Sequence, residues 1–431
     1  MSDPATNENL RAERGVRGDF EKDQRVGMKK GWQTKNLGDL CDVVGGGTPP
    51  KDKPAFYSGD IPWATVRDMR QDVITETEFR ITKDAVKNSA TNIIPSGNVV
   101  IATRVGLGKV CLLGQDTAIN QDLRGIVPRS DKALVIRYLY WWLKSIADVI
   151  VAEGTGATVQ GVKLPFVKSL QIPVPPLAEQ QRIVGLLDEA FEGLATAKAN
   201  AEKNLQNARA LFESHLQSVF TQRGPAWVET TIGELCDIKH GYAFDGADFS
   251  NDVPDGNPLV VTPGNFTEDG KLLFNERNTK RFSGNTPAGF QFDIGDLVVV
   301  MTDLSSKMKI LGKPAFVETD DVLHNQRIGR LVFSTDRVEK RLLYYFMMTE
   351  GFLKNIKMSS TGTMVKHTAP KRIMSNVIPY PANRKEQRAI VTKLDDLREQ
   401  TQHLARLYDR KLASLSALKK SLLHQAFTGA L

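Results

Sequence analysis

The chain has 431 residues, enough for two or more domains, and its 41% apolar content is typical of a soluble globular protein. Its apolar runs are all shorter than the roughly 18 residues that span a membrane, and three cysteines without C-x-x-C spacing argue against disulfides or a zinc site. We therefore expect a cytoplasmic protein with buried thiols, whose net charge of +7 permits nucleic-acid binding without requiring it.

The N-terminal segment, residues 1–30, is polar and of mixed charge. It lacks the apolar core of a secretory signal, and we expect a disordered tail. Met28, which is followed by two lysines, offers an alternative start that would leave residues 1–27 as an upstream extension.

Residues 31–176 contain short β-branched runs separated by glycine and proline, a pattern that predicts strands and loops. The stretch from Ala133 to Ala152 includes Tyr140, Trp141 and Trp142 and is predicted to be a helix packed on the sheet. We expect an α+β domain here, followed by a proline-free helical region over residues 177–222.

The second half repeats this order. Residues 223–382 are predicted to form a second α+β domain, with strands at DLVVVMT and IGRLVF and a helix from Leu342 to Ile356. Residues 383–431 are predicted to form a second helical region. The apolar positions of both helical regions recur at alternating steps of three and four, as in a coiled coil. The predicted seam consists of Leu187, Ala190, Leu194, Ala197, Ala201, Ala208, Leu211, Leu394, Leu397, Leu404, Leu415, Leu418 and Leu422. The alternative is one long amphipathic helix lying on each domain.

The two halves also share short motifs. WQTKNLGDLC at 32–41 returns as WVETTIGELC at 227–236, the Asn120-Gln121 pair returns as Asn325-Gln326, and Thr155-Gly156 returns as Thr361-Gly362. The offset grows from 195 to 207 and is constant in the helical regions. A period near 200 residues is far longer than a solenoid repeat. We infer two similar domains in a pseudo-twofold arrangement, which suits a partner with two similar sites.

No catalytic motif is present. The glycine-rich text around Lys109 lacks the first glycine and the Ser/Thr of a P-loop, and G-x-S-x-G, H-E-x-x-H and the tetrapeptide of amino-methyltransferases are missing. The six histidines lack metal-ligand spacing. We therefore predict a non-catalytic binding protein without a metal.

Basic and amide side chains beside glycines predict loops that contact DNA, because Arg and Lys suit phosphates and guanine while Asn and Gln suit adenine. The candidates in the first domain are Arg67, Arg104, Lys109, Gln121, Arg124, Thr158, Gln160 and Lys163. Those in the second are Lys307, Lys309, Gln326, Arg327, Thr363, Lys366, His367 and Arg372. Two alternatives stay open: the charged stretches form a solvated face, or the Asn-Gln pairs satisfy turn backbone.

Taken together, these motifs resemble the specificity subunits of type I restriction-modification systems. The resemblance is carried in the first half by GGTPPKDKPAFYSGDIPWATVRDM (46–69), IATRVGLGKV, AINQDLRGIVP and QIPVPPLAEQQRIVGLLD (171–188). In the second half it is carried by HGYAF (240–244), HNQRIG (324–329) and IPYPANRKEQRAIVTKLDD (378–396). It covers about residues 32–428.

The resemblance implies two target recognition domains, each contacting one half of a bipartite, asymmetric DNA sequence. The helical regions would form an antiparallel coiled coil that fixes the distance between the half-sites and docks two methyltransferase subunits. Restriction subunits with translocase and nuclease activity would join this core. S-adenosylmethionine, ATP and magnesium would bind those partners, with no cofactor in this chain.

The second half departs from the first, because it lacks a GDIPW equivalent and has MTDLSSKMK in place of the segment around Arg104. This difference fits two domains that read different half-sites. One rival interpretation is a coiled-coil structural adaptor that binds proteins only. Another is a fused enzyme with an unrecognised active site.

Overall fold

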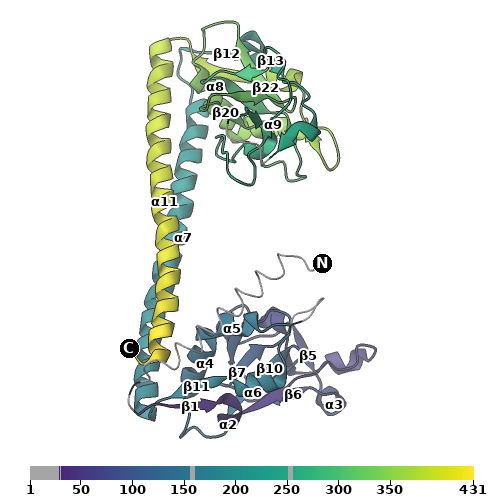
Figure 1. Ribbon diagram of the computed structural model, residues 1–431, viewed down its shortest axis with the longest axis vertical. Coiled ribbons are helices and arrows are strands. Elements are labelled where there is room, and N and C mark those ends of the chain that lie inside the picture. Colours follow the sequence, from purple (N-terminus) through teal and green to yellow (C-terminus); the bar gives the residue numbers. More distant parts are fainter. Residues whose placement is uncertain (1–28, 30, 156–160, 251–255) are drawn as a thin grey trace. The chain divides into compact units, whose positions relative to one another are not determined.

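The computed structural model describes residue 29 and residues 31–155, 161–250 and 256–431 (Figure 1). The tail expected to be disordered and the alternative start at Met28 fall outside this part of the chain, as do Thr158 and Gln160. Contacts divide the protein into two compact units, Met1–Ala201 with Arg410–Leu431, and Glu202–Asp409. Each unit combines one globular α+β domain with part of both long helices.

The first unit is built on a five-stranded sheet in the order β2-β10-β7-β8-β4. Its strands are β2 (Cys41–Gly45), β4 (Val73–Ile74), β7 (Val99–Ala102), β8 (Val110–Leu113) and β10 (Leu123–Pro128). Alternate residues of β7 enter different cores: Val99 and Ile101 face the helix side, whereas Val100 and Ala102 join a second cluster. Burial on both faces explains why this strand is a continuous apolar run.

The predicted helix over Ala133–Ala152 is two helices, α4 (Ile136–Ser145) and α5 (Ala147–Ala152). A smaller four-stranded sheet has the order β5-β3-β9-β6. Its strands are β3 (Ile61–Ala64), β5 (Phe79–Ile81), β6 (Asn92–Ile94) and β9 (Thr117–Ile119). The remaining elements of the domain are β1 (Gln33–Asn36), which pairs with β11 (Gln171–Val174), α2 (Leu37–Leu40), η1 (Pro54–Tyr57), η2 (Val66–Asp68), α3 (Lys83–Lys87) and α6 (Leu164–Ser169).

The second unit repeats this plan. Its main sheet, in the order β13-β22-β18-β20, consists of β13 (Cys236–His240), β18 (Leu297–Val300), β20 (Pro314–Phe316) and β22 (Ile328–Phe333). A second sheet contains β14 (Phe249–Ser250), β15 (Leu259–Val261), β16 (Arg281–Phe282), β17 (Gln291–Phe292) and β21 (Val322–His324). The helix predicted over Leu342–Ile356 is again divided, into α8 (Lys340–Met348) and α9 (Glu350–Met358).

Short elements complete the second domain. They are β12 (Trp227–Thr231) paired with β24 (Val377–Pro381), β19 (Thr302–Asp303) paired with β23 (Lys366–His367), α10 (Pro370–Met374), η3 (Ile232–Glu234), η4 (Gly246–Asp248) and η5 (Pro263–Asn265). The β12–β24 pair is the counterpart of β1–β11, because both join a strand at the repeated tryptophan, Trp32 or Trp227, to the strand before a long helix.

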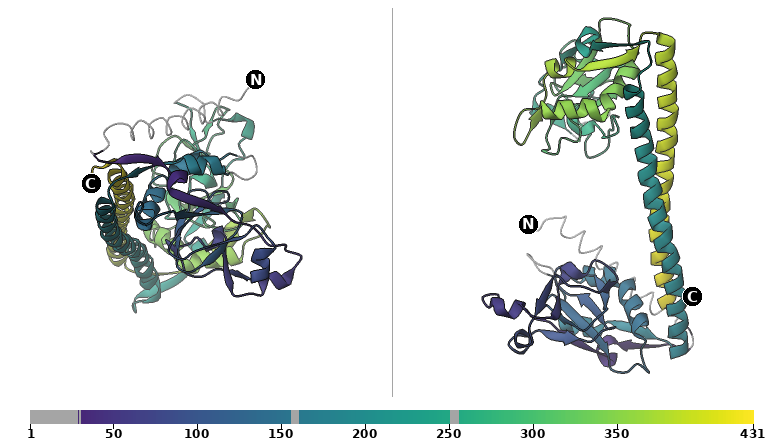
Figure 2. Two further views of the ribbon diagram at one scale, coloured as in Figure 1. Left: turned by 90° about the horizontal axis from the view of Figure 1, so that it is seen from below. Right: turned by 180° about the vertical axis from the view of Figure 1, so that it is seen from behind.

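The two long helices, α7 (Leu177–Thr221) and α11 (Arg384–Thr428), have 45 residues each and lie side by side in both views of Figure 2. In the first unit the start of α7 and the end of α11 share one core, in which Leu187 and Phe191 join Phe427. In the second unit the end of α7 and the start of α11 share another, which contains Phe220 and Leu394. The helices are therefore antiparallel. The first globular core is completed by the end of α11, which is distant in sequence, and the second by the two helix ends that flank its domain.

The members of the predicted seam differ in burial. Leu187, Ala201, Ala208 and Leu394 are buried. The partly buried members of the predicted seam are Ala190, Leu194, Ala197, Leu397, Leu415 and Leu422. Three leucines of the predicted seam, Leu211, Leu404 and Leu418, are 53%, 40% and 46% exposed.

The three cysteines are free and buried, as expected. Burial raises the pKa of Cys41 and of Cys236 to about 12 and that of Cys111 to about 11, which keeps the thiols protonated and unreactive. Among the residues that the structure describes, no helix is both long enough and apolar enough to cross a membrane.

Candidate nucleic-acid interface

Three loops of the first domain lie next to one another although they are far apart in sequence. The amide of Thr103 donates to the carbonyl of Asp122 (2.8 Å), and the amide of Val162 donates to the carbonyl of Thr103 (2.9 Å). Arg104, which follows Thr103, lies 3.6 Å from the Asp122 carboxylate. The structure thus brings together the loops after β7, before β10 and before α6.

In each Asn-Gln pair the asparagine is buried and hydrogen-bonded to the turn, whereas the glutamine is more exposed. Asn120 is buried, and its Oδ1 accepts from the Asp122 amide at 3.1 Å. Asn325 is also buried and accepts from the Arg327 amide at 3.1 Å. The asparagines therefore hydrogen-bond to the backbone of their turns, which was the alternative to a DNA contact. Gln121 is half-buried and hydrogen-bonds to Thr48, whereas its counterpart in the second domain is exposed.

The other candidates of the first domain differ in their exposure and in their contacts with other residues. Arg67, Lys109 and Lys163 are exposed, and Arg67 lies 3.7 Å from Glu78. Arg124 is half-buried and donates to the carbonyls of Gln121 (2.9 Å) and Leu123 (2.7 Å). Burial and the neighbouring Arg104 guanidinium lower its pKa, against the opposing effect of Asp122. Arg124 therefore contributes mainly to the shape and positive charge of the loop.

The second domain joins its loops in the same way. The amide of Met301 donates to the carbonyl of Arg327 (3.0 Å), and the amide of Thr368 donates to the carbonyl of Met301 (2.9 Å). Buried Asp303 holds the loop after β19, because its carboxylate accepts from the amides of Ser305 (2.7 Å) and Ile310 (3.0 Å). This loop carries Lys307, which is exposed, and Lys309, which pairs with Glu268 at 2.6 Å.

The remaining candidates of the second domain lie on two loops, on β23 or on α10. Gln326, Arg327 and Thr363 are exposed. Lys366 Nζ donates to the carbonyl of Gly362 at 2.7 Å, and His367 Nδ1 lies 3.0 Å from the Thr302 hydroxyl. Arg372 donates to the carbonyl of Ser359, directly after α9, so its side chain caps a helix end.

Sequence reasoning missed the apolar residues of this surface. Tyr242 is exposed, its carbonyl accepts from the Gln326 amide at 2.9 Å, and its ring packs on Phe244 and Phe290. Met364 and Leu304 are also exposed. Tyr242 takes the place in the second domain that Gly47 takes in the first, because its amide donates to the His324 carbonyl (2.8 Å) as the amide of Gly47 donates to the Ile119 carbonyl (3.0 Å).

The chemistry of both loop sets is that of a surface for binding. Within the described ranges there is no group of three or more His, Cys, Asp or Glu residues that could hold a metal ion. Each loop set instead presents cations and amides on rigid, hydrogen-bonded loops. Such groups match the phosphates and the base edges of a nucleic acid.

Comparison with known proteins gives a consistent result. The family model described as "Type I restriction modification DNA specificity domain" matches residues 29–205 and again residues 225–409. The EcoR124I/EcoR124II specificity subunit of Escherichia coli is 34% identical over 180 residues, which are 39% of this chain and 44% of that protein. The MjaIX specificity subunit of Methanocaldococcus jannaschii is 30% identical over 193 residues, again 44% of its length. This chain thus covers less than half of either relative.

Full-length similarity exists at lower identity. The MjaVIII specificity subunit of Methanocaldococcus jannaschii is 21% identical over 95% of both chains. A solved chain from work on complex assembly and conformational transition of the type I R-M system has a TM-score of 0.73 at 20% identity, covering 94% of this chain and 99% of its own. The HsdS subunit from Thermoanaerobacter tengcongensis has a TM-score of 0.57 at 20% identity, with 94% and 98% covered. These two structures show the same fold.

Proposed function

The chain belongs to the type I restriction-modification DNA specificity family, and from that premise we propose that it recognises a bipartite, asymmetric DNA sequence for a multisubunit complex. Like its relatives it is a specificity subunit and not a catalytic one. In this proposal each globular domain reads one half-site. The proposal places the protein in the cytoplasm with its DNA.

The observation that carries the proposal is a shared loop framework with different side chains. Thr103 and Met301 make equivalent backbone hydrogen bonds, but the residue that follows is an exposed arginine, Arg104, in the first domain and a buried threonine, Thr302, in the second. Likewise, the buried asparagine that accepts from the amide of Asp122 in the first domain accepts from the amide of Arg327 in the second. Two domains that position their loops alike and differ in the exposed groups suit two different half-sites. Each good bidentate base contact should add about 1–3 kcal/mol of discrimination.

The long helices support the bipartite part of the proposal. A helix of 45 residues is about 68 Å long at 1.5 Å per residue, far longer than one small domain requires. We propose that the antiparallel pair sets the number of unread base pairs between the half-sites. The number of turns in α7 and α11 would then determine the length of the spacer.

The same helices suggest how partners dock. Leu211 and Leu418 are equivalent positions in the repeat, and both are exposed. One lies in each unit, so the protein presents the same apolar position twice. We propose that these positions belong to surfaces for two methyltransferase subunits, with restriction subunits joining that core. S-adenosylmethionine, ATP and magnesium would act on those partners.

The proposal is tested with the full chain assembled with its methyltransferase subunits. Duplexes that this complex binds are selected from a random-sequence library and sequenced. The expected product is one motif made of two defined blocks that are separated by a spacer of fixed length and random sequence. A single continuous block would contradict bipartite reading. Binding without sequence preference or salt dependence would favour the protein-only adaptor instead.

A further inference from the structure

One hairpin of the second domain is unusually well fixed at its tip. The amides of Thr361 and His367 each donate to the other's carbonyl at 3.0 Å, and β23 pairs with β19 through Thr302↔His367 and Asp303↔Lys366. Gly362 has a φ of 96°, and a Cβ there would lie 2.0 Å from the Val365 carbonyl oxygen. Only glycine therefore allows this turn. The Lys366 ammonium adds a hydrogen bond to the Gly362 carbonyl at 2.7 Å.

The tip of this rigid hairpin is apolar. Met364 is 80% exposed, and Val365 beside it is also exposed. Continuing the β19–β23 register places Leu304, 59% exposed, next to Val365. Single exposed apolar residues are ordinary, but three adjoining ones on hydrogen-bonded loops mark a surface that binds something.

The surroundings of the tip indicate DNA bases as its target. Lys307 lies on the loop that Asp303 holds, and Lys366 lies on the hairpin itself, so cations are available for phosphates. Arg327 is joined through the Met301 amide to the strand beside the hairpin, and the adjacent Gln326 is exposed. Both can hydrogen-bond to base edges in the major groove. On that edge the one apolar group is the thymine 5-methyl.

We propose that Met364 reads a thymine by packing against its 5-methyl group in the second half-site. The inference rests on the proposed function and adds to it the kind of base that the hairpin selects. Methionine suits this role because its thioether chain is flexible and polarizable. The repeat places Thr158 at the corresponding position, so the first domain has no methionine there.

The test removes the methyl group alone. In the duplex obtained by selection, each thymine of the second half-site is replaced in turn by deoxyuridine, and affinity is measured by fluorescence anisotropy with the assembled complex. At one position the wild-type protein should lose about fourfold in affinity, the value of burying one methyl group. Met364→Ala should bind the thymine and uracil duplexes equally there.

Two controls isolate the hairpin tip. Met358→Ala removes a methionine that is 77% exposed at the end of α9, and it should retain the fourfold ratio. Uracil substitutions in the first half-site should affect wild type and Met364→Ala alike. Both controls show that a change in ratio comes from Met364 and not from altered folding.

Two outcomes overturn the inference. Either no thymine of the second half-site shows a methyl effect in the wild type, or Met364→Ala keeps that effect. Loss of methyltransferase association in Met364→Ala, with the ratio intact, would assign the tip to protein docking instead. If no duplex is bound with sequence preference, the proposed function itself fails, and that result is visible before any uracil is introduced.

Discussion

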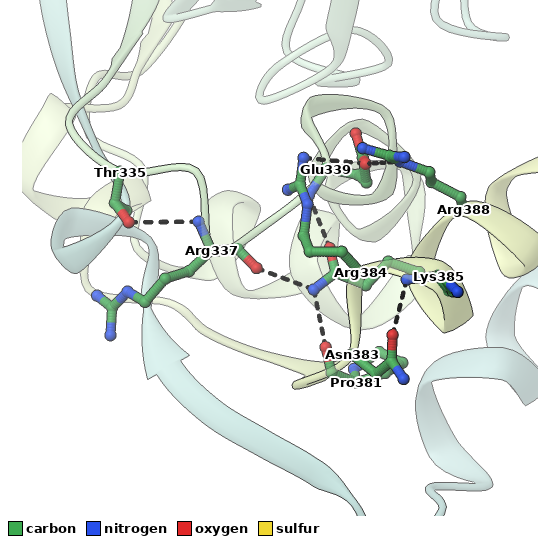
Figure 3. A network of polar contacts seen from close by, with 9 residues as sticks. Thr335, Arg337, Glu339, Pro381, Asn383, Arg384, Lys385 and Arg388 are labelled. Carbon is green, nitrogen blue, oxygen red and sulfur yellow. Dashed lines mark hydrogen bonds and ion pairs between the residues drawn. The ribbon is translucent and has the colours of Figure 1, made fainter.

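Gln180 and Gln387 lie 207 positions apart, are both 0% exposed, and make the same three hydrogen bonds. Gln180 accepts from the Val135 amide at 2.8 Å and donates to the carbonyls of Ala133 (3.1 Å) and Pro175 (2.9 Å). Gln387 accepts from the Glu339 amide (2.8 Å) and donates to the carbonyls of Arg337 (2.9 Å) and Pro381 (2.8 Å). Figure 3 labels these three partner residues. Each glutamine ties the first turn of a long helix to the globular domain beside it.

Replacing either glutamine should destabilise its own unit. Gln387→Ala leaves one buried amide and two carbonyls without their partner, and each unpaired buried group costs about 1–3 kcal/mol. We expect a loss of about 3 kcal/mol in the free energy of unfolding, measured by urea denaturation. Gln400→Ala, at an exposed position of the same helix, should change stability by less than about 0.5 kcal/mol. An equal effect of both variants would show that the hydrogen bonds are unimportant.

These glutamines show how far the sequence could lead. The constant offset of 207 aligns them, but burial was not predictable because glutamine is usually exposed. The burial of the seam positions was not predictable for a related reason. A three-four spacing marks apolar positions without saying what covers them, and Leu216 and Phe220 of α7 enter the core of the second domain while Leu211 remains exposed.

Glycines beside basic and amide groups predicted loops at these positions, but not how free each side chain is. Whether a side chain is free depends on neighbours from distant segments, as when the Asp122 carboxylate meets Arg104, or the Ser359 carbonyl meets Arg372. Exposed apolar residues such as Met364 resemble core residues in the sequence, so only the folded hairpin identifies them.

Acid should weaken the second domain through His324. Burial lowers the pKa of this histidine from its ordinary 6.5 to about 4, despite the Ile328 carbonyl, which accepts from Nε2 at 2.9 Å. Above pH 6.5 the neutral ring is favoured in both folded and unfolded protein. As the pH falls from 6.5 towards 4, the unfolded chain binds the proton more tightly, so stability is progressively lost.

The expected loss is about 2 kcal/mol between pH 6.5 and pH 5, measured by urea denaturation at each pH. His324→Gln should show a flatter pH dependence over this interval. If His324→Gln and the wild type lose stability in parallel, another group is responsible.

Arg104 and Lys366 should contribute to DNA binding through charge. Removing one phosphate contact weakens binding to all sequences similarly and reduces the slope of log affinity against log salt by about 1. We expect this result for Arg104→Ala and for Lys366→Ala, measured by anisotropy at several salt concentrations. Lys35→Ala, at an exposed position of β1, is the charge-matched control and should leave the slope unchanged. If a variant has the same slope as this control, the residue it replaces does not contact DNA.

The spacer length should follow the length of the helices. Inserting one heptad into α7 between residues 201 and 208, with a matching heptad in α11 near Asp409, lengthens both helices by about 10 Å. At 3.4 Å per base pair the selected spacer should grow by about 3 base pairs, with both half-sites unaltered. Selection from a random-sequence library measures this directly. A spacer of unchanged length would refute the idea that the helices set it.

The exposed leucines of the helices should affect assembly without affecting folding. Leu211 and Leu418 are 53% and 46% exposed, so Leu211→Lys and Leu418→Lys should change the free energy of unfolding by little. If two methyltransferase subunits cover these positions, each substitution buries a charge in an apolar contact and should weaken the docking of one subunit. Native mass spectrometry of the complex should then show one methyltransferase subunit for either single variant and none for the double variant.

The matched control for this experiment is a leucine that already contacts the globular core. Leu216→Ala, in the core of the second unit, should lower stability by about 2–5 kcal/mol while the folded fraction retains both partners. The two kinds of variant therefore separate docking from folding. Full occupancy by two methyltransferase subunits in the double variant would mean that the repeated leucines lie outside the docking surfaces, and the equivalence of the two positions would then reflect only the common origin of the halves.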